Sequence, residues 1–284
     1  PEGGRDAKGQ HVANLLAFQP EERIAQVLAI RTYEDAQYLV LATKSGLVKK
    51  TPLEMYNSPR SGGIIAVNLR EDEEGKPDEL VSAQLANADD DLLLVSRDGQ
   101  AVRFAATDEQ LRPMGRSTSG VRGMKFRGDD ELLTMDVPRE GTDLLIVTDS
   151  GYAKRTPIEE YPTKGRGTMG VRVGRLVEER GGLVGALVVD PEEDIMVITE
   201  SGKLVQVNAS DVRPTARNTM GVIFARPDDG DRIIAITRNS DSGDEDETDE
   251  SENTEATEAV EGTDTPADEA SAPAGGDDTA DADK

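Results

Sequence analysis

Five short loops in the sequence combine an arginine with nearby glycine. Three of them share an Arg-x-x-x-Gly-Val frame that begins at Arg116, Arg166 or Arg217, and looser copies begin at Arg5 and Arg60. Glycine permits close backbone approach, and exposed amides beside an arginine can hold a phosphate group. Successive arginines lie 50 to 56 residues apart, an interval typical of a repeat architecture. The loops therefore predict an anion-binding feature that recurs along the chain.

Two further marks follow the same period. Short turns ending in glycine stand between apolar runs, which is typical of β-hairpins; the glycines are Gly46, Gly99, Gly151 and Gly202. Each hairpin leads to a segment that predicts a single helical turn, and Thr51–Glu54 and Thr156–Glu159 are possible capping boxes. The arginine loop comes next, and then two more strands, for example Val121–Phe126 and Leu132–Val137.

About four strands per repeat of some 50 residues predict an all-β, propeller-like array of blades. We expect the array to occupy residues 1–240, with about four complete blades and partial ones at the ends. The apolar run before each turn is continuous, so these strands are expected to be buried on both faces. An ordinary β-sandwich is the alternative, but three marks in one register disfavour it.

The net charge of −25 hides an uneven distribution of charge. Residues 241–284 hold 18 acids and one lysine and hardly any large apolar residue, which predicts a disordered acidic tail. Residues 1–240 carry the remaining −8. Within a repeat, bases gather in the hairpin and its loop, as in residues 40–70 with 5 bases and 1 acid. The next connection is acidic, as in residues 71–91 with 1 base and 9 acids.

The sequence gives no support for catalysis, for metal binding or for a membrane partner. There is no cysteine, and His11 is the single histidine, so neither a His-dependent triad nor a Cys or His metal site can be built. The acidic runs lack EF-hand spacing, and no Gly-Lys-Ser/Thr motif opens a helix. No run of eighteen apolar residues occurs.

The fourth residue after each hairpin glycine forms a second basic series, made of Lys50, Arg103 and Arg155, with Gln206 in the last repeat. With the loops, this column predicts a basic belt across the blades. Solvated strand charge is the alternative for any single member. The candidate phosphate-binding residues of this belt are Lys49, Lys50, Arg60, Arg103, Arg116, Lys154, Arg155, Lys164, Arg166, Arg172 and Arg217.

Three segments, Gly9–Leu16, Tyr38–Thr51 and Leu111–Arg116, closely resemble the C-terminal domain of the DNA gyrase A subunit in an actinobacterial version. The resemblance covers about residues 5–240. It implies a β-pinwheel whose blades exchange strands, with duplex DNA wrapped around a basic rim. That family has a Gln-x-Arg-Gly-Gly-Lys-Gly box. Its nearest match is the loop from Lys164 to Gly170, which keeps some of the glycines and the arginine; the box-like residues are Gly165, Arg166, Gly167 and Gly170.

The loop departs from the box at Thr168 and Met169, where the family has Gly and Lys. This departure keeps the C-terminal domain of the topoisomerase IV A subunit open as an alternative. A propeller that binds proteins through its acidic loops is the alternative from another class.

The resemblance also implies an ATP-dependent type II topoisomerase of two A and two B subunits that introduces negative supercoils. This chain would be its non-catalytic wrapping part, in the cytoplasm and associated with the nucleoid. None of its tyrosines can be assigned the catalytic role, and ATP and Mg²⁺ would bind elsewhere in the holoenzyme. The expected partners are double-stranded DNA, the rest of the gyrase A polypeptide, and gyrase B. We expect contacts to phosphates and not to base edges, because a wrapped sequence is arbitrary.

Overall fold

The computed structural model describes residues 14, 22–60, 62–72 and 74–239. The chain divides into two units, Pro1–Ser242 and Gly243–Lys284. The predicted acidic tail, His11 and the loop that begins at Arg5 lie outside the described residues. None of the helices in the described part of the chain is long and apolar enough to cross a membrane.

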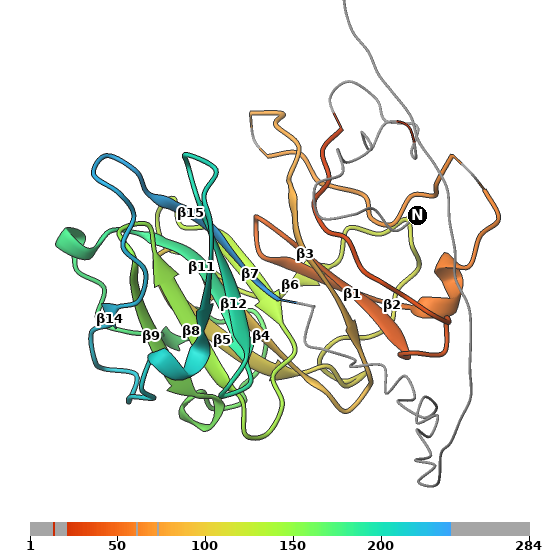
Figure 1. Cartoon of the computed structure of the whole chain (residues 1–284). Coiled ribbons are helices and arrows are strands. Elements are labelled where there is room, and N and C mark those ends of the chain that lie inside the picture. Colours follow the sequence, from red (N-terminus) through yellow and green to blue (C-terminus); the bar gives the residue numbers. More distant parts are fainter. Residues whose placement is uncertain (1–13, 15–21, 61, 73, 240–284) are drawn as a thin grey trace, which may run out of the picture. The chain divides into compact units, whose positions relative to one another are not determined.

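The described chain consists of β-strands and single 3-10 turns (Figure 1). Its strands are β1 (Tyr38–Thr43), β2 (Leu47–Pro52), β3 (Leu80–Ala86), β4 (Asp91–Ser96), β5 (Gln100–Ala105), β6 (Val121–Arg122), β7 (Leu132–Asp136), β8 (Asp143–Thr148), β9 (Tyr152–Pro157), β10 (Val171–Arg172), β11 (Leu183–Val189), β12 (Asp194–Thr199), β13 (Leu204–Asn208), β14 (Val222–Ile223) and β15 (Ile233–Arg238). The 3-10 helices are η2 (Leu53–Tyr56), η3 (Ile158–Glu160), η4 (Glu178–Arg180) and η5 (Ala209–Asp211).

The four predicted hairpins are present as β1–β2, β4–β5, β8–β9 and β12–β13. Their turn glycines all have positive φ, between 78° and 84°, which a residue with a side chain rarely adopts. The continuous apolar runs of β1, β4 and β8 are largely buried on both faces as expected, most completely in β8, where all six residues are buried. In β12 buried and half-buried residues alternate, so the expectation is confirmed for the first three hairpins and is wrong for the fourth.

The predicted helical turns are also present, but not the capping boxes. Pro52 and Pro157 occupy the N-cap positions of η2 and η3, and neither helix has a side-chain cap. Proline has no amide hydrogen and a fixed φ, so it favours the turn without a capping hydroxyl. The equivalent turn η5 is capped, because the Asn208 side chain accepts from the Ser210 amide.

The sheets show that neighbouring repeats exchange strands. The strand orders are β3-β1-β2-β6, β10-β5-β4-β7, β11-β8-β9-β14 and β13-β12-β15. The short outermost strands β6, β10 and β14 each follow an arginine loop and pair with the hairpin of the preceding repeat. This is the β-pinwheel that the resemblance implied. Two consecutive strands after the loop, as in Val121–Phe126 and Leu132–Val137, therefore belong to different blades.

The fourth blade differs from the expected four-stranded pattern. Among the described residues its sheet has three strands, and no strand pairs with the outer edge of β13. Leu204 in β13 is 60% exposed, whereas its counterparts Val48, Ala101 and Ala153 in the other blades are buried. The exposure follows from the absence, within the described chain, of a further repeat to donate a strand to this edge.

The hydrophobic core lies between the blades. One cluster joins the first two blades through Val40, Leu92, Leu94 and their neighbours. A second cluster joins blades 2 and 3, and a third joins blades 3 and 4. Blades 2 and 3 therefore pack both faces of their inner strands against neighbours, whereas blades 1 and 4 each share one cluster. The short outermost strands β6, β10 and β14 remain at the exposed edge.

Candidate nucleic-acid interface

The basic column that follows the hairpin glycines lies in the interior. Lys50 is fully buried, and its Nζ donates to the Ala106 carbonyl at 2.5 Å and to Asp108 Oδ1 at 2.9 Å. The same Nζ lies 4.4 Å from the ring centre of Tyr38, its neighbour on β1. This lysine therefore connects its hairpin to the next repeat and is not available to a ligand.

The arginines of the column make equivalent connections. Arg103 donates to Asp91 on the paired strand at 2.7 Å and to the Ile158 carbonyl of the next repeat at 3.1 Å. Arg155 donates to the Pro191 carbonyl at 2.6 Å, and its Nε lies 3.4 Å from Asp143. The surface position that we expected for this column is wrong, because strands packed between two blades place side chains from both faces in the core.

Lys49 and Lys154 are buried as well, again against expectation. The Lys49 amine donates to the Ala66 and Arg116 carbonyls, and the Lys154 amine donates to the Val173 carbonyl at 3.3 Å. Burial, joined by the Arg116 charge in the case of Lys49, lowers the pKa of both amines to about 8. Both amines therefore hold exchanged segments in place from the inside.

The three loop arginines, Arg116, Arg166 and Arg217, also bind backbone carbonyls of neighbouring segments, but from nearer the surface. Their Nη1 atoms donate to backbone carbonyls two residues after the preceding loop glycine; the pairs are Arg116 with Ile65 at 3.3 Å, Arg166 with Arg122 at 3.0 Å, and Arg217 with Arg172 at 3.3 Å. These side chains are half-buried. Their recurrence therefore has a structural cause, and their role as phosphate contacts stays a prediction.

The loop glycines are explained by the same packing. A Cβ on Gly120 would lie 2.5 Å from the Val48 carbonyl oxygen, and one on Gly170 would lie 2.0 Å from that of Ala101. The close approach predicted for these glycines occurs, but the loop approaches the neighbouring blade. A Cβ on Gly167 in the box-like loop would make only an ordinary contact, 3.5 Å from the Arg122 carbonyl oxygen, and Gly165 is exposed.

A recurring set of exposed bases lies on the outermost strands and just after them. Of the predicted residues, Arg60, Lys164 and Arg172 are exposed. The structure also shows exposed bases two or five residues after a loop glycine, which the sequence did not lead us to predict. Together with Arg172 these form the rim bases, all exposed: Arg122, Lys125, Arg172, Arg175 and Arg226.

The backbone confirms that the rim bases occupy equivalent places. The Lys125 amide donates to the Thr168 carbonyl at 2.9 Å, and the Arg175 amide donates to the Thr219 carbonyl at 3.0 Å. Both threonines stand two residues before the glycine of the next loop. Each such base therefore sits beside the following arginine loop. Alignment of the repeats on the loop glycine would have revealed this series from the sequence.

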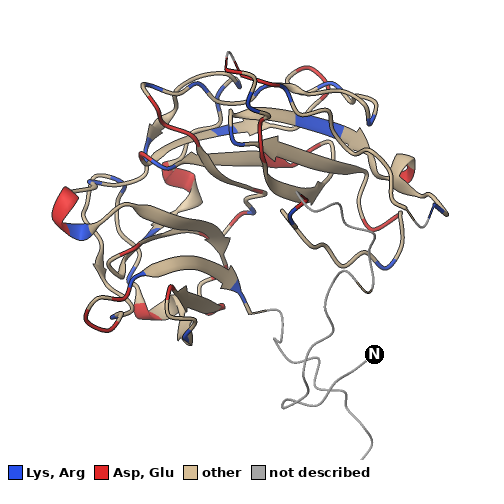
Figure 2. Ribbon diagram, turned by 90° about the horizontal axis from the view of Figure 1, so that it is seen from above, with Lys and Arg blue, Asp and Glu red and all other residues tan. Residues whose placement is uncertain are grey.

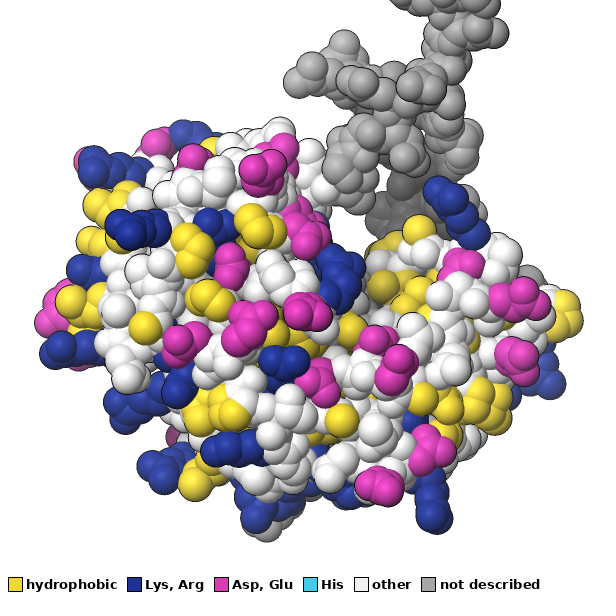
Figure 3. Space-filling view, turned by 90° about the horizontal axis from the view of Figure 1, so that it is seen from below, with side chains coloured by type: hydrophobic (Ala, Val, Ile, Leu, Met, Phe, Trp, Pro, Cys, Tyr) yellow, Lys and Arg dark blue, Asp and Glu magenta, His cyan; other side chains and the backbone are white. Residues whose placement is uncertain are grey.

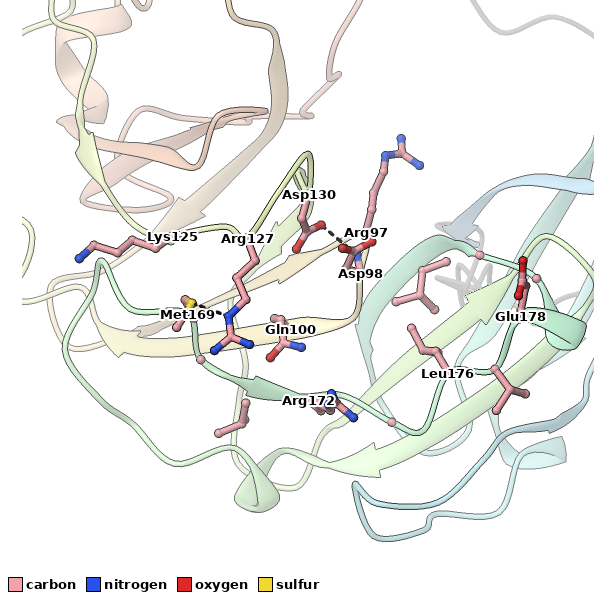
Figure 4. A pocket seen from close by; sticks show the side chains of 17 residues that line it. Arg97, Asp98, Gln100, Lys125, Arg127, Asp130, Met169, Arg172, Leu176 and Glu178 are labelled. Atoms are coloured by element: carbon pink, nitrogen blue, oxygen red, sulfur yellow. Dashed lines mark hydrogen bonds between the residues drawn. The ribbon is translucent and has the colours of Figure 1, made fainter.

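A groove of about 820 Å³ opens beside β10 and includes two rim bases (Figure 4). Arg97, Lys125, Arg127 and Arg172 line it, together with the acids Asp98, Asp130 and Glu178. Arg127 Nε donates to the Met169 sulfur at 3.2 Å, which places the box-like loop on the groove wall. A second groove, of about 430 Å³, is lined by seven acids and four bases. Each groove therefore holds both charges, with bases in the majority in the first and acids in the majority in the second, and the rim base Arg122 lines the second.

Basic residues occur in strands and loops and on several parts of the surface. Figure 2 shows basic positions within strands as well as in loops, so the place of a base along the ribbon does not reveal whether it is buried. On the face drawn in Figure 3, Lys and Arg side chains follow much of the outer edge, and several Asp and Glu lie toward its centre. Some Lys and Arg side chains also lie toward the centre of this face, and some Asp and Glu at its edge.

Comparison with known proteins agrees with the fold and with the repeat boundaries. The family model described as DNA gyrase C-terminal domain, beta-propeller, matches four consecutive segments, residues 37–87, 90–139, 142–190 and 193–240. The DNA gyrase A subunit of Streptomyces coelicolor is 53% identical over 96% of this chain, and that of Mycobacterium tuberculosis strain CDC 1551 is 58% identical over 86%. The chain spans about a third of the length of these relatives, 32% and 29%.

Two solved structures share the fold at 24% sequence identity and a TM-score of 0.72. They are a DNA gyrase A C-terminal domain, with 82% of this chain and 76% of the other covered, and the C-terminal domain of a DNA topoisomerase IV, with 81% and 70% covered. These likenesses support the fold without separating the two enzymes, whereas the close sequence relatives above are gyrase polypeptides. Since the family model matches four consecutive segments that together cover more than half of the chain, the chain belongs to the DNA gyrase A C-terminal domain family.

Proposed function

We propose that this chain binds duplex DNA along the outermost strands of its blades and bends the duplex around the array. The observation that supports this most directly is the series of rim bases, which recurs at equivalent exposed positions on successive blades. Phosphates recur along any duplex, so a surface that repeats a basic group blade after blade suits a bent backbone. The 3-10 helices of the described chain have three or four residues, too short to act as recognition helices. Contacts therefore go to phosphates, and binding is independent of base sequence.

In this proposal the chain is the wrapping part of a DNA gyrase A polypeptide. It acts in the cytoplasm with the rest of that polypeptide and with gyrase B, in an assembly of two A and two B subunits that supercoils DNA negatively. The catalytic tyrosine, ATP and Mg²⁺ belong to other parts of that assembly. The chain itself supplies a curved, positively charged track and no bond-breaking group.

The uneven distribution of charge also supports a defined path for the DNA. The second groove has an excess of acids, Glu71, Asp72 and Glu79 among them, which disfavours phosphate beyond the rim base Arg122 at that groove. The bases of the interior are held by carbonyls and carboxylates, so they offer nothing to a duplex. The rim bases are exposed and recur from blade to blade, which favours a path for the DNA backbone along the outer strands.

The salt dependence of duplex binding tests this path. A variant with all five rim bases replaced by Ala should lose about 0.9 units of the log–log salt slope per phosphate contact, or roughly 4 to 5 units in all. The control variant replaces two exposed arginines that face carboxylates, Arg139 with Asp190 and Arg232 with Glu200. It should keep the wild-type slope.

Wrapping needs a second measurement, since a basic surface binds DNA without bending it. Ligation of nicked circular DNA in the presence of the wild-type chain should trap a change in linking number, and the five-base variant should trap almost none. An unchanged salt slope in a folded five-base variant would overturn the proposed path. A wild-type chain that binds DNA without any change in linking number would overturn wrapping.

A further inference from the structure

A buried carboxylate near the centre of the array joins three blades. Asp136 ends β7, the inner strand of blade 2, and its side chain is 8% exposed. Its Oδ1 accepts from the Val137 amide at 2.9 Å, and its Oδ2 accepts from the Val188 amide of β11 in blade 3, also at 2.9 Å. The same Oδ2 accepts from the Arg238 guanidinium at the end of β15 in blade 4.

The arginine makes the connection reach beyond neighbouring blades. Arg238 also donates to the Val188 carbonyl, at 3.0 Å from Nε and 2.6 Å from Nη2, and its Nε lies 3.6 Å from Glu193. The pair with Asp136 spans 102 positions of sequence and passes over blade 3. One guanidinium and one carboxylate therefore fix three consecutive inner strands by hydrogen bonds.

This link is particular to the C-terminal part of the array. In blade 1 the position that corresponds to Asp136 is Gln84, since Gln84 pairs with Val40 as Asp136 pairs with Leu93. Gln84 Nε2 makes a contact of 3.4 Å with the Met135 carbonyl of the next blade. At this position blade 1 makes a neutral contact with blade 2, whereas the charged pair connects blade 2 with blade 4.

Stacked repeats mainly contact their nearest neighbours, so small rotations between blades add up along the array. A bond that skips one blade, here from blade 2 to blade 4, limits the accumulated rotation directly. We propose that the Asp136–Arg238 pair is a positioning device, which fixes the rotation and rise of blade 4 relative to blade 2. DNA held on the rim follows the blades, so the pair also determines the superhelical path of the bound duplex. The second half of this inference rests on the proposed function.

The test uses Arg238→Gln, which removes the charge, and Arg238→Lys, which keeps the charge with a shorter reach. Loss of one partner of a buried pair is destabilising, so all measurements are made at a temperature where every variant is shown to be folded. Small-angle X-ray scattering of the free chain reports the arrangement of the blades without DNA. Arg238→Gln should change the scattering profile, and Arg238→Lys should restore part of the wild-type profile.

The second readout is the linking-number change per bound chain, measured beside duplex affinity. Arg238→Gln should lower that change at least twofold while affinity and salt slope stay within about twofold of wild type. Asp136→Asn combined with Arg238→Gln should add little to the single change, because both remove one interaction. Arg139→Gln removes an exposed ion pair with Asp190 and serves as the matched control, with wild-type scattering and wrapping.

The outcomes separate this inference from the proposed function. Wild-type scattering in Arg238→Gln would overturn the positioning role, whatever the chain does with DNA. Altered scattering with an unchanged linking-number change would overturn the claim that the pair directs the DNA path. A wild-type chain without any linking-number change would overturn the proposed function and the DNA half of this inference together, and would leave the scattering result to decide the positioning role.

Discussion

Two glycines of one loop, Gly167 and Gly170, allow a sharp test of why the arginine loops contain glycine. Both have φ of +72°. Their surroundings differ, because a Cβ on Gly167 would lie 3.5 Å from the nearest atom, the Arg122 carbonyl oxygen. A Cβ on Gly170 would lie 2.0 Å from the Ala101 carbonyl oxygen and 2.5 Å from its carbon. Replacing each by Ala therefore separates backbone strain from steric conflict with the neighbouring blade.

The magnitudes follow from these distances. Alanine in the left-handed region costs about 1 to 2 kcal/mol at either position. At Gly170 the added carbon also has to move about 1 Å or more to reach ordinary contact distance, which separates β10 from β5. Each hydrogen bond lost there costs about 1 kcal/mol, so we expect about 3 to 4 kcal/mol for Gly170→Ala. In a unit of this size, 1 kcal/mol corresponds to roughly 2–4 °C in Tm.

Thermal unfolding followed by circular dichroism measures both variants. Gly167→Ala should lower Tm by about 2–8 °C and Gly170→Ala by about 6–16 °C, with the difference arising from the blade contact alone. Salt-dependent DNA binding at low temperature should stay close to wild type for Gly167→Ala. Equal destabilisation by the two substitutions would refute the view that loop glycines serve strand exchange.

Three further predictions concern the buried bases and the tail. Replacing Arg155 by Met should lower the free energy of unfolding in urea by about 3–5 kcal/mol, because the carboxylate of Asp143 then stays buried without a counter-charge. The control Arg139→Met removes an exposed arginine and should cost about 0–1 kcal/mol. Equal effects of the two substitutions would contradict a stabilising role for the buried pair. The free energy of unfolding should rise from pH 7.5 to 9.5, because Lys49 and Lys154 lose their protons near pH 8 when folded and near 10.5 when unfolded. A variant with Met at both positions that rises as steeply would count against this. Deleting residues 241–284 removes a charge of −17 and should tighten duplex binding, most strongly at low salt, and unchanged affinity across a salt series would show that the tail does not compete.

The blade architecture could be predicted because its marks are local. Hairpin glycines require positive φ, proline favours the 3-10 turn, and apolar runs of strand length identify the inner strands. The exchange of strands could not be derived in this way. Val121 and Arg122 form a two-residue strand, and its partners Val48 and Leu47 lie more than 70 positions earlier. A pairing this short and this distant leaves no pattern in hydropathy. The exchange of strands was therefore expected only from the resemblance to the family.

The candidate site was predicted less well, for a physical reason. A base that recurs at one place in every blade is consistent with a ligand that follows the blades and equally with a bond that every blade needs. Lys50, Arg103 and Arg155 recur for the second reason, since each links its hairpin to the following repeat. Lys125 and Arg175 recur on the surface instead. Periodicity reports that a position matters in each repeat, but burial decides which kind of partner it has.

The two kinds of base depend on each other in this fold. The buried bases and the loop arginines bond to backbone carbonyls of exchanged segments, and such bonds fix where the outermost strands lie. The rim bases stand on those strands or just after them, so their spacing is set from the interior. A duplex bent around the blades requires phosphate contacts at fixed intervals. A base that is out of register with the phosphates makes no contact and releases no counterion. Substitution of a buried base should therefore weaken DNA binding even though its side chain never meets a phosphate, and it should do so by disordering the rim bases that it holds in register.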